Sequence, residues 1–174
     1  MTDDATGLPP HVQALIGKPR YEERSEFPIE MGYVYNTCAA VQNGNPVYWD
    51  RAVAEEIAGG PVTPPTMMSV WFRPHYWSPG AEGERLALRS HFDLKELLDL
   101  PEAIISENEA AFGEPVRPGD TLTTRQVIRS ISPPKDTKLG RGRFWTIDVE
   151  TYNQRDEWVG TESYTALGYR RGTS

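Results

Sequence analysis

The sequence predicts a single α+β domain, and three observations lead to this prediction. Apolar residues recur at helical spacing in the first half of the chain, whereas apolar and polar residues alternate with a period of two in the second half. The 174 residues have the length of one cooperative domain. Helices gathered before strands favour one long buried helix with an antiparallel sheet wrapped around it.

The N-terminal segment, residues 1–20, is polar and contains prolines, so we expect a loose leader before a single domain at residues 21–172. Residues 21–27 are expected to form a short strand. Residues 29–42 should form an amphipathic helix, because apolar side chains recur there at helical spacing. They are Met31, Val34, Tyr35, Cys38 and Val41.

A second, short helix is expected after Asp50, which is a suitable N-cap, and Gly59 should end this helix. Two prolines, Pro64 and Pro65, then precede an apolar run that predicts the start of the buried helix. Residues 74–100 show no clear pattern, and we interpret them as an irregular insertion after that helix.

The strands are expected in the second half of the chain. The first should lie at about residues 121–131, and a polar turn follows at residues 133–142. The next two strands alternate apolar and polar residues on either side of a turn at residues 153–156. Short turns between successive strands predict an antiparallel meander.

Charge and cysteine content exclude several classes of function. The formal net charge is −7, which disfavours binding to the phosphate backbone of a nucleic acid. Cys38 is the only cysteine, so neither an internal disulfide nor a cysteine-rich metal site is expected. The first residues lack the apolar region of a signal peptide, and no apolar run is long enough to span a bilayer, so we expect a cytoplasmic protein.

Three segments resemble MaoC-like acyl-thioester hydratases and dehydratases, which have the hot-dog fold. VQNGNPVYWDRAVAEEIAGGPVTPPTMMSVW resembles the helix, the G-D-x-N-P-[IV]-H-x-D loop and the start of the central helix in that family. FGEPVRPGDTLTTRQVIRSI resembles its strand, R-P-[IV]-x-x-G-D turn and next strand. YNQRDEWVGTESYTALGYR resembles its final hairpin.

The resemblance implies an acyl group carried as a thioester on coenzyme A or an acyl carrier protein, and a second hot-dog subunit. No cofactor is expected, because coenzyme A belongs to the substrate. In competent members of the family, an Asp and a His of the loop activate the water that adds to an enoyl thioester, which is general acid–base chemistry.

This sequence departs from the family at those positions, because the Asp falls on Asn43 and the His on Tyr48. An amide cannot take up a proton usefully near pH 7, and an ordinary phenol, with a pKa of about 10, is a poor base. Competent members also present backbone N–H groups to the thioester carbonyl where this chain has prolines, which lack that donor. In this respect the chain resembles the non-catalytic, substrate-binding lobe of paired hot-dog dehydratases.

We therefore expect the acyl-binding lobe of a hydratase or dehydratase that needs a catalytic partner. Two alternatives are a self-sufficient homodimeric hydratase or thioesterase with rearranged catalytic residues, and a non-enzymatic acyl-CoA-binding module. Asn43 can also be read simply as a turn former.

Further candidates carry open alternatives. The candidate acyl-binding residues are Pro65, Thr66, Trp71, Phe72, Tyr76 and Trp77, although aromatic residues this dense also pack cores. Arg141 and Arg143 are candidates for the coenzyme A phosphates, or are simply solvated. His75 and His91 could replace the lost base, or be structural.

Overall fold

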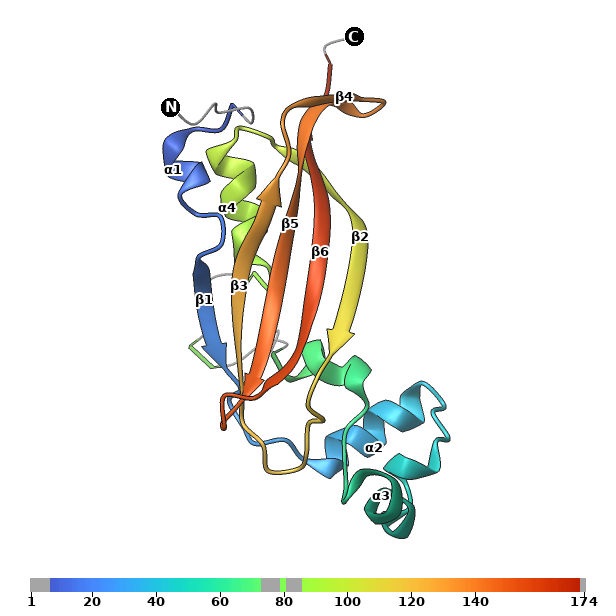
Figure 1. Cartoon of the computed structure of the whole chain (residues 1–174). Helices are drawn as coiled ribbons and strands as arrows, with labels where there is room; N and C mark the ends of the chain where they lie inside the picture. Colours follow the sequence, from blue (N-terminus) through green and yellow to red (C-terminus); the bar gives the residue numbers. More distant parts are fainter. Residues whose placement is uncertain (1–6, 73–78, 81–85, 173–174) are drawn as a thin grey trace.

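The computed structural model describes residues 7–72, 79–80 and 86–172 (Figure 1). In chain order the elements are α1 (Pro10–Gln13), β1 (Pro19–Arg24), α2 (Met31–Ala40), η1 (Pro46–Tyr48), α3 (Arg51–Ala58), η2 (Pro65–Phe72), α4 (Arg89–Leu97), β2 (Glu102–Phe112), β3 (Leu122–Ile131), β4 (Lys135–Thr137), β5 (Gly140–Asn153) and β6 (Trp158–Arg170). The helices η1 and η2 are 3₁₀ helices.

The sheet is antiparallel, with strand order β1-β3-β5-β6-β2 and the short β4 paired to β5. Its centre is the predicted meander of β3, β5 and β6. The strand β2 pairs with β6 along one side and ends the sheet, and most of its residues are exposed. The first strand lies slightly earlier than the expected residues 21–27, because Tyr21 has a φ of 52° within an irregular pairing of β1 with β3.

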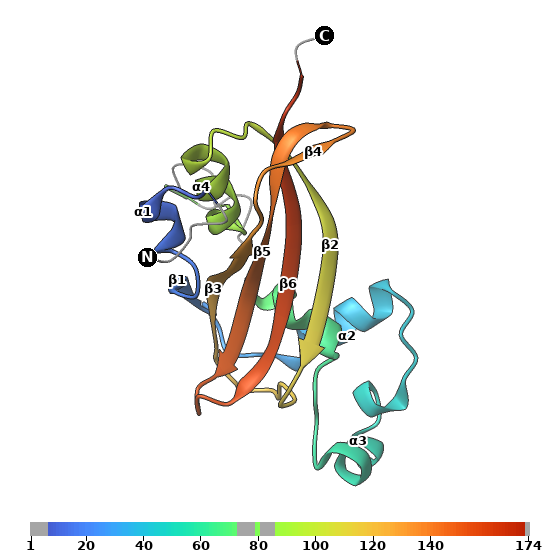
Figure 2. The ribbon, with the colours of Figure 1, turned by 45° about the horizontal axis from the view of Figure 1, so that its top comes forward.

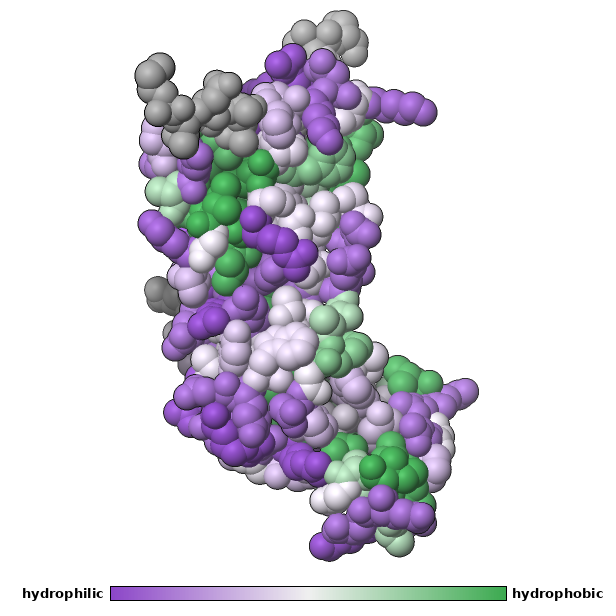
Figure 3. All heavy atoms as spheres, in the orientation of Figure 1, coloured by the Kyte–Doolittle hydropathy of each residue, from purple (hydrophilic) through white to green (hydrophobic). Residues whose placement is uncertain are grey.

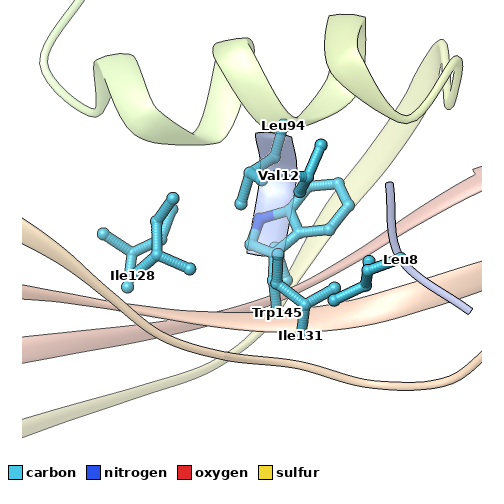
Figure 4. Packing of buried hydrophobic residues seen from close by; sticks show 8 residues of the cluster. Leu8, Val12, Leu94, Ile128, Ile131 and Trp145 are labelled. Atoms are coloured by element: carbon cyan, nitrogen blue, oxygen red, sulfur yellow. The ribbon is translucent and has the colours of Figure 1, made fainter. Parts of the chain in front are cut away.

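One face of the sheet carries a core under α1 and α4. Trp145 of β5 is 1% exposed and packs among Val12 of α1, Leu94 of α4 and Ile128 of β3 (Figure 4). The expectation of a loose leader is therefore wrong for residues 7–20, because burying Val12 anchors this segment to the sheet. Part of the predicted irregular insertion is regular as well, since α4 lies within it.

The predicted central helix begins at the expected place but is a 3₁₀ helix, η2. Met68 packs on Leu122, and Met67 packs under α2 with Cys38. The sheet face is thus covered by η2 at one end and by α4 with α1 at the other (Figure 2).

The elements α2, η1 and α3 form an arm that extends beyond the end of the sheet (Figures 1 and 2). The predicted helix boundaries are confirmed here. Asp50 accepts hydrogen bonds from the N–H groups of Ala52 and Val53, and Gly59 ends α3 with a φ of 66°. The arm exposes large apolar side chains, which Figure 3 shows at its lower right: Val41 is 68% and Ile57 is 71% exposed.

Candidate functional site

The loop between α2 and α3 holds the two positions at which the resemblance places catalytic residues. The Asn43 side-chain oxygen accepts a hydrogen bond from the Asn45 N–H at 3.1 Å, and the Asn45 side chain accepts from the Val47 N–H at 3.1 Å. The Trp49 indole N–H donates to the Asn43 carbonyl at 2.7 Å. The reading of Asn43 as a turn former is thereby confirmed, because its acceptor oxygen holds the loop.

Tyr48 lies at the other catalytic position and is half-buried against the cluster of Val34, Cys38 and Met67. Burial, with a smaller contribution from Cys38, raises the pKa of Tyr48 above its ordinary value. The phenol therefore remains protonated near neutral pH and cannot act as a general base. It can still donate a hydrogen bond.

Trp49 does not pack in a core. The residue is 46% exposed, and its ring stacks on that of Tyr35 of α2 at 5.4 Å between centroids. The stacked pair lies on the projecting arm, so the loop presents an aromatic surface to its surroundings.

The start of η2 lies where competent relatives present N–H groups to a thioester carbonyl. Thr63 donates its N–H to the Val116 carbonyl at 2.9 Å, and Met67 donates to the Pro64 carbonyl at 2.9 Å. Pro64 and Pro65 have no N–H to offer. Both Pro65 and Thr66 are exposed.

Two of the candidate acyl-binding aromatics lie in the described part of the chain. Trp71 and Phe72 are half-buried and pack beside Met68 and Val116. The Trp71 indole N–H is buried without a hydrogen-bond partner among the described residues, and its ring lies 5.7 Å from that of Tyr33. Tyr76, Trp77 and His75 lie outside the described residues.

A match to a family model decides which family this chain belongs to. The model described as "FAS1-like, dehydratase domain region" matches residues 14–162. The chain belongs to this dehydratase family. The match supports the predicted MaoC-like resemblance and covers the loop, η2 and every strand except the second half of β6.

This dehydratase-family chain has a curated relative and several structural neighbours. It is 30% identical, over 165 residues, to a probable enoyl-CoA hydratase alpha subunit from Thermomonospora curvata, covering 91% of this chain and 50% of that protein. The chain thus spans about half the length of the curated relative it matches.

Solved structures confirm the hot-dog fold. The ChsH1-ChsH2 complex from Mycobacterium tuberculosis superposes with a TM-score of 0.76 at 22% identity, covering 94% of this chain and 90% of that chain. The HadBC (3R-hydroxyacyl-ACP dehydratase) complex from the same organism gives 0.59 at 19% identity, covering 88% and 97%. A MaoC-like dehydratase from Rhodospirillum rubrum gives 0.57 at 18% identity, covering 91% and 94%.

The basic residues predicted for coenzyme A phosphates have other partners in this dehydratase-family chain. Arg141, at the exposed β4–β5 hairpin, lies 3.6 Å from Asp136. Arg143 donates to the carbonyls of Ser132 at 2.9 Å and Gly7 at 2.8 Å, which ties the N-terminal segment to the sheet. Phosphate binding by this pair stays a prediction.

His91 of α4 lies in the core, 9% exposed, and its Nδ1 accepts a hydrogen bond from the Trp145 indole N–H at 3.2 Å. Burial lowers the pKa of His91, and Lys95 lowers it further. His91 is therefore a neutral residue of the core beside Trp145, and it does not belong to the loop between α2 and α3.

Sequence reasoning missed the role of Arg117 in the R-P-x-x-G-D turn. Its guanidinium donates to the Ala58 carbonyl at 2.6 Å and to the Pro61 carbonyl at 3.5 Å, so it joins the sheet to the end of α3. Asp120 holds the turn by accepting from the Arg117 N–H at 2.8 Å. Arg117 thereby positions the arm and its loop.

A groove lies elsewhere, on the sheet face opposite α4. It measures about 550 Å³ and contains Arg129, Asp148 and Ser163. The Asp148 carboxylate accepts from Arg129 at 2.7 Å and from Ser163 at 2.7 Å. None of the residues predicted for the site lines this groove.

Two further findings concern the described residues only. They contain no group of three or more His, Cys, Asp or Glu side chains placed to hold a metal ion. No helix among them is long and apolar enough to cross a membrane.

Proposed function

We propose that this chain is the acyl-thioester-binding lobe of an enoyl hydratase or dehydratase, and that a second hot-dog subunit supplies the catalytic Asp and His. One observation carries the proposal. At the family's two catalytic positions stand an amide that holds its own loop, Asn43, and a half-buried phenol that stays protonated, Tyr48.

The free edge of the sheet supports a partner subunit. β2 has eleven residues and pairs on one side only, with Ile104, Ile105 and Phe112 between 43% and 48% exposed. Long unpaired strands with exposed apolar residues are places where another chain adds to a sheet. The arm, which carries the stacked Tyr35 and Trp49, projects past the C-terminal end of β2 (Figures 1 and 2). A subunit that binds along the edge of β2 would therefore also contact the arm.

The relatives point the same way. The curated relative is named an alpha subunit, and two of the structural neighbours are complexes. An acyl group would lie along η2, where Pro65, Thr66, Trp71 and Phe72 are the candidate contacts, and coenzyme A or an acyl carrier protein would carry it. The unpaired indole N–H of Trp71 can donate to an oxygen of such a ligand.

The test compares the purified chain with the chain co-expressed with a hot-dog subunit that retains D-x-N-P-x-H. We expect no hydration of an enoyl-CoA by the chain alone, and turnover by the pair. In the pair, changing the partner's Asp to Asn should abolish turnover, whereas Tyr48→Phe in this chain should leave it nearly unchanged.

Turnover by the chain alone, lost in a Tyr48→Phe variant, would instead establish the self-sufficient enzyme. Stabilisation by acyl-CoA without turnover or a partner would establish the non-enzymatic module, because a ligand of the folded state raises the melting temperature. Either result would overturn the proposal.

A further inference from the structure

A cluster of basic and hydroxyl side chains lies where β1 meets the first turn of α4, apart from the loop and η2. Arg20 and Tyr21 come from β1, and Arg89, Ser90 and Asp93 come from α4. The guanidinium carbons of Arg20 and Arg89 lie 4.8 Å and 4.4 Å from the centre of the Tyr21 ring. Both charges are therefore held near one aromatic side chain.

Positive charge exceeds negative charge in this cluster. Asp93 pairs with Arg20 at 2.9 Å and accepts a hydrogen bond from the Tyr21 hydroxyl at 2.5 Å. Arg89 is exposed and has no carboxylate partner among the residues that the structure describes. The cluster thus holds two guanidinium groups and one carboxylate, and only Arg20 pairs with that carboxylate.

The cluster also contains buried polar atoms without partners. Within the described part of the chain three such side-chain atoms are found, and two of them, Arg20 Nη1 and Ser90 Oγ, are here. Gln126 links them, because it faces Arg20 in the β1–β3 pairing and accepts the Ser90 N–H at 2.9 Å. A buried donor without a partner costs free energy, so these two atoms indicate an acceptor that the described residues do not supply.

We propose that this junction is a binding site for a phosphate group. A phosphate has several strong acceptor oxygens, which suit two guanidinium groups and a hydroxyl better than a single water or one carbonyl does. The start of α4 adds favourable helix-dipole charge, although the Gln126 side chain already accepts the Ser90 N–H there.

The phosphate can come from two sources with the same chemistry: inorganic phosphate, or the phosphates of coenzyme A. If the site binds the phosphates of coenzyme A, it rests on the function proposed above. If it binds inorganic phosphate, it is independent of that function, so binding of inorganic phosphate tests the site even if the chain binds no acyl-CoA.

Isothermal titration of the whole chain in a phosphate-free buffer, at constant ionic strength, tests the site with inorganic phosphate and with coenzyme A as probes. The test variant is Arg89→Gln, which changes an exposed side chain and should leave the fold intact. The matched control is Arg51→Gln, an exposed arginine at the start of α3 on the arm. Ser90→Ala is a second test variant that removes only a hydroxyl.

We expect saturable binding of inorganic phosphate that is about tenfold or more weaker in Arg89→Gln, weaker in Ser90→Ala, and unchanged in Arg51→Gln. If coenzyme A competes with inorganic phosphate and its binding depends on Arg89, the phosphate that the site binds is that of coenzyme A. If coenzyme A does not compete, the site binds free phosphate. Non-saturable binding, or affinity that is unchanged in Arg89→Gln, would overturn the proposal.

Discussion

Replacing Leu94 by alanine tests whether α4 packs on the sheet and covers it. Leu94 is 0% exposed and packs with Trp145, Val12 and Ile128 (Figure 4). Removing a fully buried leucine side chain costs about 2–5 kcal/mol, because apolar contacts are lost and a cavity remains. The rigid neighbours here, an indole and two β-branched side chains, leave little room for collapse, so we expect about 3 kcal/mol or more.

The matched control is Leu97→Ala on the same helix, where the side chain is 39% exposed. Because both variants change helix propensity equally, the difference between them measures burial alone. Urea unfolding followed by tryptophan fluorescence should show a large loss for Leu94→Ala and a loss of less than about 1 kcal/mol for the control. Equal losses for the two variants would refute the packing of α4 on the sheet.

Three further outcomes are expected. Arg117→Ala should cost about 1–3 kcal/mol and speed amide hydrogen exchange in α3, since it removes the bonds that join the arm to the sheet; unchanged exchange in α3 would contradict this role. The pKa of His91 is lowered in the folded state, so the unfolded state binds the proton more readily and the free energy of unfolding should fall as pH drops below about 6.5, less so in His91→Asn; an equal fall in both proteins would exclude His91 as the cause. Asp50→Ala should lower stability by about 1 kcal/mol in the same urea assay, because two N–H groups lose their acceptor; no change would show that the cap adds nothing.

Local signals in the sequence were sufficient where a residue acts on its own neighbours. Asp50 caps and Gly59 ends α3 because both effects depend only on the adjacent backbone. The alternation around Trp145 and Ile147 likewise predicts a half-buried strand with one face in the core. The amide and phenol of the loop were visible directly from the motif.

The remaining features depend on contacts between distant segments. Val12 lies in a short polar stretch, and only the sheet beneath it explains its burial. Residues 74–100 show no clear pattern in the sequence, because Ser90 and His91 of α4 are buried beside Gln126 and Trp145, which their own polarity does not indicate. Arg117 gave no local sign that it would reach the end of α3.

The free edge of the sheet has a further consequence for how copies of this protein meet. β2 carries Glu102, Glu107 and Glu109, and it contains no lysine or arginine. Two such strands laid side by side in opposite directions would bring like charges together, which is unfavourable, whereas a strand with basic side chains would be attracted. The acidic residues therefore discourage self-stacking into fibrils while leaving the edge open to a chain of complementary charge.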